Sequence, residues 1–304
     1  KNEVLAVELY RKAADQGHAQ AQNNLGEMYA NGCCLSKDID QAAVLYMKSA
    51  EQGYAQAQYN MGVMYETGIS TPKDSKRAVA YYMKAAQQGH VLAQFNLGVM
   101  YGDGSGVTKD KIRAVEWYRE AAEQGHAQAQ YNFGVMLEDG EGLEKKDEAS
   151  AVEWYWKAAD QGITQAMFNL GVMYSSGRGC EKDEVHAVEW YRKAAEQGHA
   201  GAQCNLGIMY SSERGVEKDE AIAVEWYWNA ADQGCAQAQF NMGVMYEDGN
   251  GVPKDEARAV EWYRKAAEQG HADAQYSLGV MYHDGFGTVP KDEARAIEWY
   301  RKAA

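Results

Sequence analysis

Histidine is the side chain most often used for proton transfer near neutral pH, so the seven histidines are considered first. Five of them stand directly after a Gln-Gly pair: His18, His90, His126, His199 and His271. A catalytic residue is needed once, so five equivalents favour a role at a helix start or in a loop. His186 and His283 are single, and their positions imply no nucleophile or carboxylate partner. The chain contains no G-x-S-x-G, H-E-x-x-H or Walker motif, and we predict no catalytic residues.

The cysteines do not have the spacing of a metal site. They are Cys33, Cys34, Cys180, Cys204 and Cys235, without any C-x-x-C pair or Cys/His cluster. The loops D-G-S-G (103–106) and D-G-N-G (248–251) lack the spacing and the terminal Glu of a calcium loop. We therefore expect no metal and no cofactor. An odd number of irregularly spaced cysteines favours free thiols in a reducing compartment such as the cytoplasm.

The charge of the chain narrows the class of partner. It has 30 Lys and Arg against 44 Asp and Glu, a net charge of −14 and a pI near 5.0. Because Lys and Arg drive phosphate binding, we expect neither nucleic acid nor an anionic membrane as partner. The field of an acidic chain favours a basic partner. No apolar run is long enough to insert across a bilayer.

The first ten residues, K-N-E-V-L-A-V-E-L-Y, carry charges inside their apolar stretch and are not typical of a signal peptide. They resemble the middle of a larger pattern. We therefore expect an excised segment, and the compartment stays open.

The elements that position these residues recur with a fixed period. The glycine of the Gln-Gly pair returns every 36 residues, with one step of 37, at Gly17, Gly53, Gly89, Gly125, Gly162, Gly198, Gly234 and Gly270. A period of this length indicates a repeat architecture. Two repeats are one residue longer than the 36-residue period. Their extra residues fall around 138–149 and 283–294, which we interpret as surface loops that tolerate insertion.

Each period contains two helical patterns. Helix A is expected from about 126 to 138, and helix B from about 148 to 160, where alanines and a tyrosine form the apolar stripe. Such a hairpin is too small to bury its own apolar face, so stacked hairpins must form a shared core. The prediction is a single array over 1–304. It starts with a lone helix B (1–17), and the eight A–B repeats are 18–53, 54–89, 90–125, 126–162, 163–198, 199–234, 235–270 and 271–304.

The recurring pattern A-x-x-N-L-G-x-M-Y-x-x-G-x-G-V-x-K-D-x-x-x-A-V-E-W-Y-x-K-A-A-E-Q-G-H resembles the Sel-one-like repeat family, which is related to tetratricopeptide repeats. The resemblance covers essentially the whole chain. Departures are Asn23 and Cys204 in place of an aromatic residue, Ser277 in place of Asn, and a loop at 211–215 without its first glycine. The resemblance implies an all-α, right-handed α-solenoid (superhelix) of stacked antiparallel helix-turn-helix repeats. It also implies a scaffold or adaptor that binds other proteins, with helix A lining the concave side.

Helix A is apolar on two sides, which gives it a second face in addition to the one that stacking covers. Phe168 and Val172 lie on this second face, with Asn169 at its edge and acids at the helix end. The candidate groove residues are Tyr59, Phe95, Tyr131, Phe168, Phe240, Val99, Val135, Val172, Asn60, Asn96, Asn132, Asn169, Asn205, Asn241, Glu66, Asp103, Asp139 and Asp248.

Two interpretations of this second face stay open. The rings and valines could pack one repeat onto the next, while the asparagines hydrogen-bond between repeats. Alternatively, the asparagine amides could hold the backbone of an extended peptide while rings and acids select its side chains. The tryptophans of helix B are expected to pack, with the extra Trp156 and Trp228 facing outward or lying between repeats. The small Gly201 and Cys204 suggest a local hollow, which a neighbouring Phe or Met filling that space would rule out.

The sequence therefore predicts a non-catalytic protein-interaction scaffold or adaptor. It would bind a basic or mixed apolar peptide, or a partner domain, on the concave helix-A surface. One alternative is a hydrolase or β-lactam-binding protein, as the resemblance implies for a disulfide-rich branch whose cysteine pairing is missing here. A second alternative is a purely structural spacer. Both ends lack polar capping helices, so head-to-tail association of copies is a further expectation.

Overall fold

The computed structural model describes residues 2–287 and 289–304. These residues form helices and connecting loops, with one isolated bridge between Phe286 and Val289. Contacts divide the chain into two compact units, Lys1–Trp154 and Tyr155–Ala304, and each unit is described by itself. The single array over 1–304 stays a prediction.

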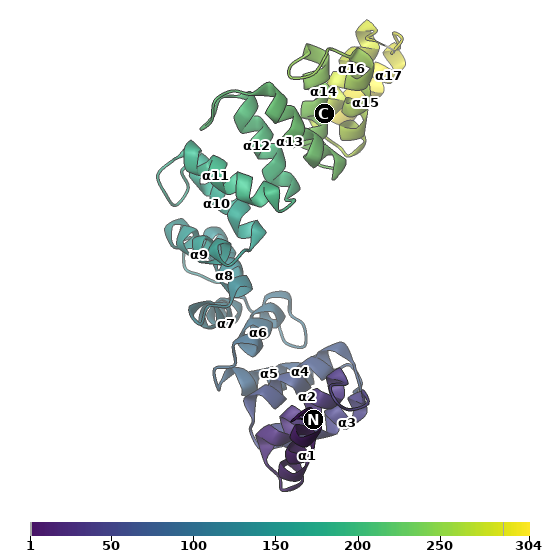
Figure 1. The fold of residues 1–304 in the computed structure, drawn as a ribbon. Helices are drawn as coiled ribbons and strands as arrows, with labels where there is room; N and C mark the ends of the chain where they lie inside the picture. The colour runs from purple at the N-terminus through teal and green to yellow at the C-terminus, as the bar shows by residue number, and fades with distance from the viewer. Residues whose placement is uncertain (1, 288) are drawn as a thin grey trace. The chain divides into compact units, whose positions relative to one another are not determined.

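The first unit is built from helices that follow one another at the repeat period (Figure 1). They are α1 (Asn2–Asp15), α2 (Ala19–Asn31), α3 (Ile39–Glu51), α4 (Ala55–Thr67), α5 (Ser75–Ala86), α6 (Val91–Asp103), α7 (Lys111–Glu123) and α8 (Ala127–Asp139). Helix α9 (Glu148–Asp160) includes the division between the units.

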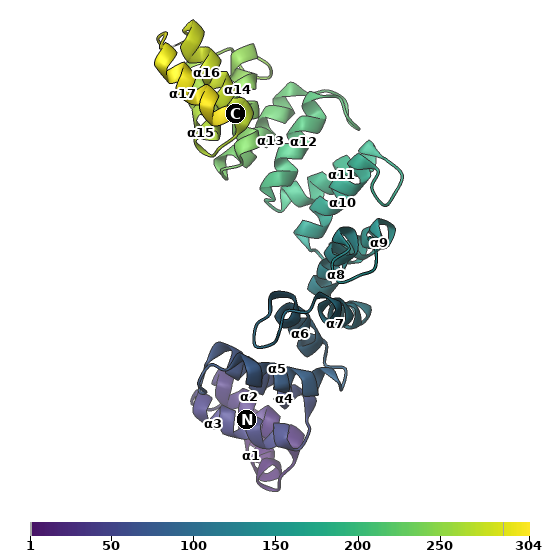
Figure 2. The same ribbon diagram turned by 180° about the vertical axis from the view of Figure 1, so that it is seen from behind.

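The second unit continues the same alternation (Figure 2). Its helices are α10 (Thr164–Ser176), α11 (Glu184–Glu196), α12 (Ala200–Ser211), α13 (Glu220–Asp232), α14 (Ala236–Asp248), α15 (Glu256–Glu268), α16 (Ala272–Asp284) and α17 (Glu293–Ala303). The densest contacts in both units join an A helix to the B helix that follows it, as in α4 with α5 and α12 with α13.

A glycine in each A helix permits this close pairing. A Cβ built on Gly62 would lie 2.5 Å from the ring of Tyr82, and one on Gly243 would lie 2.6 Å from the ring of Tyr263. Any larger side chain would push the two helices apart. The alanines opposite, such as Ala78, are fully buried. The glycine of the A helix therefore receives the tyrosine ring of the following B helix.

The helix ends follow from residue types with known capping preferences. Asp255 has extended backbone angles, and its side chain accepts a hydrogen bond from the Arg258 amide at 3.0 Å, as expected of an N-cap. Helix α4 is capped at its C-terminal end by Gly68, whose φ of 77° is left-handed and strongly favours glycine. The histidine at 126 caps α8 through Nδ1, which accepts from the Ala129 amide. The predicted role at a helix start is confirmed for this histidine.

The all-α solenoid of stacked antiparallel helix pairs is confirmed as the fold class. The predicted bounds of helix B at 148–160 match α9, and helix A begins one residue later than expected, at Ala127. Among the described residues, no helix is long and apolar enough to cross a bilayer.

Candidate functional site: the second face of helix A

The asparagines of the second face are half-buried and bonded to protein groups. Asn60 donates from Nδ2 to Asn23 Oδ1 at 3.0 Å, linking α4 to α2. In α8, Gln128 donates to Asn132 Oδ1 at 3.1 Å, and in α14 Gln237 does the same to Asn241. These amides are partly used within the fold.

The same asparagines reach the tyrosine of the preceding B helix. Burial raises the pKa of Tyr227 to about 12, while a hydrogen bond from Asn241 works against that rise. Burial likewise raises the pKa of Tyr118, and the hydrogen bond from Asn132 opposes it. The equivalent contacts join Asn96 to Tyr82 and Asn205 to Tyr191. The asparagines thus bridge successive repeats, as the packing interpretation requires.

The end of helix A supplies a second partner for the tyrosine hydroxyl. Tyr82 donates to Glu66 Oε2 at 2.5 Å, and Tyr263 donates to Glu247 Oε2 at 2.6 Å. A serine hydroxyl takes this place beside Tyr191, where Ser175 lies at 3.2 Å. Glu66 is therefore a partner of Tyr82 rather than a free rim acid.

The aromatic residues of the second face are partly covered by the next repeat. The rings of Tyr59 and His90 stack with centroids 4.6 Å apart, and those of Phe168 and His199 lie 4.4 Å apart. The pairs Phe95–His126 and Phe240–His271 stack in the same way. Tyr276 of α16 remains 59% exposed.

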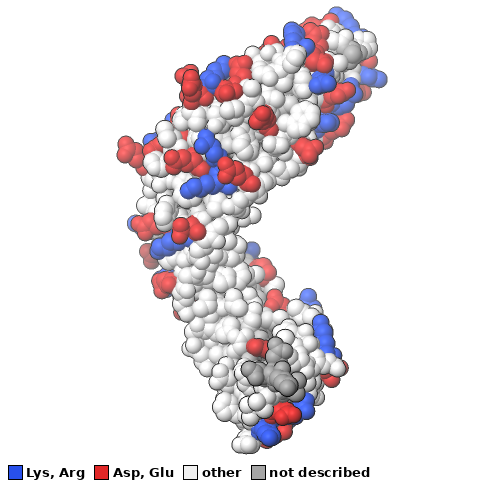
Figure 3. Space-filling model, in the orientation of Figure 1, with Lys and Arg blue, Asp and Glu red and all other residues white. Residues whose placement is uncertain are grey.

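The rest of the second face is open to solvent to varying degrees. Val99 is 37% exposed, while Val135, Val172 and Asn169 are half-buried. The acids at the helix ends are exposed: Asp103, Asp139 and Asp248. On the face in Figure 3, acidic and basic atoms stand side by side over the second unit, so no single-signed patch forms there.

A hollow in the first unit brings five of the candidate residues together. Its volume is about 340 Å³, and Val99, Asp103, Tyr131, Asn132 and Val135 line it. The lining also includes residues that the sequence did not single out, namely Gly102, Lys111, Tyr118, Met136 and Glu141. A second hollow of about 260 Å³ lies in the second unit, between Glu247, Tyr276, Val280 and Asp284 among others. Each hollow has an apolar floor with acids at its edge.

A sequence model of the Sel1 repeat matches the chain along its whole length, at residues 1–18, 19–54, 55–90, 91–126, 127–163, 164–199, 200–235, 236–271 and 272–304. The chain belongs to the Sel1 repeat family. The resemblance to Sel-one-like repeats is thereby confirmed.

Two solved structures are similar over nearly the whole chain. One is c5321, described as a protective antigen present in uropathogenic Escherichia coli strains displaying an SLR fold, with 41% identity and a TM-score of 0.86. It matches over 98% of this chain and 63% of its own, so this chain spans less than two thirds of its length. A Sel1 repeat protein from Oxalobacter formigenes is 38% identical, with a TM-score of 0.73, over 97% of this chain and 85% of its own. The comparison with curated proteins gave no match.

Buried glutamines provide a link within Sel1 repeats that the sequence analysis missed. Gln58 donates to Ala50 O at 3.3 Å, and its own Oε1 accepts from Gln88 at 2.8 Å. The same arrangement joins Gln203 to Gln233. The signal was available, because the Gln of A-Q and the Gln of Q-G recur with the period. Their distance of 30 residues along the chain concealed the pairing.

The predicted hollow beside Gly201 and Cys204 was wrong. Cys204 is only 3% exposed, and a Cβ built on Gly201 would lie 3.3 Å from the ring of Phe168. The neighbouring phenylalanine therefore fills the space. Cys204 instead forms a hydrogen-bonded pair with Cys235, and this bond together with burial raises the pKa of the Cys204 thiol.

His186 has a carboxylate partner that its position did not suggest. Its Nδ1 lies 2.7 Å from Asp183 Oδ2, and this hydrogen bond raises the pKa of the imidazole. Its ring also stacks on Tyr174, at 5.6 Å. In another Sel1 repeat, Arg258 stands in the same place, between Asp255 and the ring of Tyr246. The histidine thus replaces a structural arginine at the start of a B helix.

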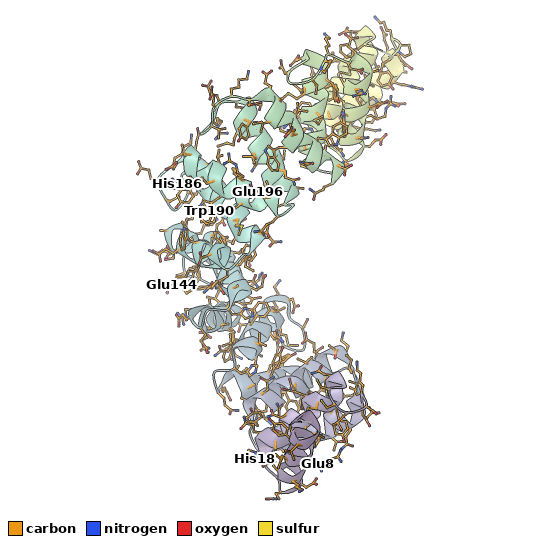
Figure 4. The ribbon with its side chains drawn as sticks, in the orientation of Figure 1. Glu8, His18, Glu144, His186, Trp190 and Glu196 are labelled. Carbon is orange, nitrogen blue, oxygen red and sulfur yellow. The ribbon has the colours of Figure 1, made fainter. Side chains whose placement is uncertain are left out.

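The extra tryptophans of the second unit face outward, as predicted. Trp156 is 50% exposed and meets the edge of Trp190, and Trp228 is 45% exposed and meets the edge of Trp262. Trp190 and His186 both lie on α11 in Figure 4. In the described part of the chain, no group of three or more His, Cys, Asp or Glu side chains is placed to hold a metal ion.

Proposed function

We propose that this Sel1 repeat chain is a non-catalytic interaction scaffold that binds an extended peptide, or an extended segment of a partner protein, on the second face of helix A. Its fold is one commonly used for protein interaction. The observation that carries the finer proposal is the 340 Å³ hollow of the first unit, where an apolar floor, an asparagine and an acid converge. Peptide-binding surfaces combine apolar area with a few placed polar groups in this way.

The chemistry of the hollow favours a peptide of mixed apolar and basic character. Val99 and Val135 supply apolar surface, and Asp103 is exposed at the edge. The net charge of −14 would speed the approach of a positively charged partner. The remaining candidate residues, including Phe168, Asn169 and Val172 of the second unit, are proposed to serve the same role in their own repeats.

The test uses a positional-scanning library of N-acetylated, C-amidated peptides, each with two lysines. The variant carrying Val99→Glu and Val135→Glu places charges on the floor of the hollow, and it should lose binding because apolar contact is lost. Val185→Glu is the matched control, since Val185 is 56% exposed on α11 and lies outside the hollow. Unchanged helical circular dichroism and thermal unfolding would show that the variants fold.

Two results would overturn the proposal. One is the absence of saturable binding by any library component to the unaltered protein. The other is full retention of binding by the Val99→Glu, Val135→Glu variant. The first result would favour a structural spacer, a second candidate that rests on the coverage of Phe95 and Phe168 by histidines of the next repeat. The second result would mean that the peptide binds outside this hollow.

A further inference from the structure

In several helix pairs, the tyrosine of the B helix has a characteristic hydrogen-bond environment. Its hydroxyl donates to a residue at the end of the paired A helix, as Tyr82 does to Glu66 at 2.5 Å and Tyr263 does to Glu247 at 2.6 Å. In the second unit, Ser211 Oγ lies 3.1 Å from the Tyr227 hydroxyl at the equivalent place, and either atom can be the donor. A carboxylate or a hydroxyl can therefore fill this place.

In the pair formed by α6 and α7, this place holds no side chain. The equivalent residue is Gly102, and a Cβ built there would lie 3.9 Å from the Tyr118 hydroxyl and 3.9 Å from Ala114 Cβ. These are ordinary contact distances, so a small side chain would fit there. The place belongs to the 340 Å³ hollow, which both Gly102 and Tyr118 line. Figure 1 shows the helices α6 and α7 that carry these two residues.

The hydroxyl of Tyr118 is left with an unused proton. The residue is 8% exposed, and Asn132 donates to its oxygen. Asn132 is oriented for this by Gln128, which occupies its Oδ1 at 3.1 Å. Among the residues that the structure describes, no side chain is seen to accept the Tyr118 proton. Because Tyr118 lines the hollow, its hydroxyl can donate to a group that enters, which makes this site selective for a group that can accept.

The charges around the hollow indicate which acceptor fits. Asp103 and Glu141 line it, and the one basic residue in the lining, Lys111, is ion-paired with Glu141. A carboxylate entering this space would meet net negative charge in a partly desolvated setting. A neutral oxygen would not be repelled by this charge.

We propose that the space over Gly102 is a side-chain subsite, in which a hydroxyl or carboxamide oxygen of a bound peptide (Ser, Thr, Asn or Gln) accepts the hydrogen bond of Tyr118. The ligand oxygen then replaces the oxygen that Ser175, Ser211 or Glu66 supplies in other repeats. This inference rests on the proposed function, because the peptide backbone must lie along the second face to deliver that side chain. One hydrogen bond to a buried donor corresponds to about a tenfold preference in affinity.

The test repeats the peptide library with two variants that close the subsite in different ways. Gly102→Ser supplies an internal hydroxyl, as Ser175 and Ser211 do, and Tyr118→Phe removes the donor while keeping the ring that packs on Gly98. The unaltered protein should select Ser, Thr, Asn or Gln about tenfold at one peptide position. Both variants should lose that selection and retain binding to the rest of the peptide.

A gain-of-function variant provides the matched comparison. Ser175→Gly removes the hydroxyl that lies 3.2 Å from Tyr191, and it should create a second position with the same preference. Binding to the unaltered protein without a polar preference would mean that only water occupies the space, and the subsite would be rejected. A preference that survives in Tyr118→Phe would reject it equally. If no peptide binds at all, the proposed function fails together with this inference.

Discussion

Two neighbouring helix pairs of the second unit differ on one face and agree on the other. In α10–α11, Phe168 stacks on His199 of the following repeat. In α12–α13, the equivalent places hold Cys204 and Cys235. The backbone at the cap position is nearly the same in both repeats, with φ/ψ of −70°/107° at His199 and −64°/109° at Cys235.

The face on which helix A packs against helix B is built in the same way in both pairs. Tyr191 bonds Ser175 and packs on Gly171, while Tyr227 bonds Ser211 and packs on Gly207. The fold therefore depends on the face shared by each pair. The second face can change its residues without altering the helices, and it is the face on which repeats can diverge in function.

The largest expected effect would follow from a change on the shared face. Gly171→Ala and Gly207→Ala should each destabilise the chain by about 2–3 kcal/mol, because the new methyl group would lie 2.5–2.6 Å from a tyrosine ring. The two losses should be equal, since both pairs use the same contact. Urea unfolding followed by circular dichroism measures them.

Gly102→Ala is the control for that experiment. Its Cβ would have neighbours only at 3.9 Å, and alanine favours a helix over glycine by up to about 1 kcal/mol. This variant should be neutral or slightly stabilised. If Gly171→Ala were tolerated as well as Gly102→Ala, the distinction between the two kinds of helical glycine would be wrong.

A smaller effect is expected when the second face of one pair is converted into that of the other. Cys204→Phe and Cys235→His together rebuild the ring stack seen between Phe168 and His199. A double-mutant cycle should give a favourable coupling of about 0.5–1.5 kcal/mol, the usual value for an aromatic pair. Strictly additive single and double variants would show that the cysteine pair and the stacked pair are not interchangeable.

Much of the fold was predictable from the sequence because its causes are local. The period placed both helices, and the capping preferences of residues such as Asp255 and Gly68 explain where helices begin and end. The contacts between residues far apart along the chain were harder to predict. The partners of Phe168 and Gln58 stand 31 and 30 residues away, at His199 and Gln88, and the pattern of a single helix does not reveal which side chains meet.

The sequence predicted which face of helix A carries the candidate site, but not which repeat has a distinctive hollow on that face. Five of the residues assigned to it lie together in one hollow, including Val99 and Asn132. The feature that distinguishes this hollow, Gly102 beside Tyr118, arises from a missing side chain. Its meaning depends on the equivalent positions of other repeats, where Glu66 and Ser175 bond the tyrosine. The predicted hollow at Gly201 failed for the related reason that Phe168 of the previous repeat occupies it.

The smallest expected effect concerns the histidines that cap A helices. His199 is one of them, and Cys235 holds the equivalent cap position in the next repeat. Burial lowers the pKa of His90, His126 and His199 below the ordinary value of about 6.5. The folded chain therefore binds fewer protons than the unfolded chain, so this part of the stability is present above pH ~6.5 and is lost as the pH falls through the lower, folded-state values. Protonation also removes the Nδ1 acceptor that bonds the Ala202 amide.

His199→Asn keeps a capping acceptor that does not titrate, so it should flatten the dependence of the urea midpoint on pH between ~7 and ~5. Ile163→Ala, which alters the equivalent cap position of α10 and involves no titrating group, should leave that slope unchanged. Below pH ~4 a further loss is expected from Asp183, whose pKa is lowered by its hydrogen bonds to His186. A His199→Asn variant with the slope of the unaltered protein would show that the cap histidines do not titrate with folding, and the contrast with Cys235 would then be limited to ring stacking.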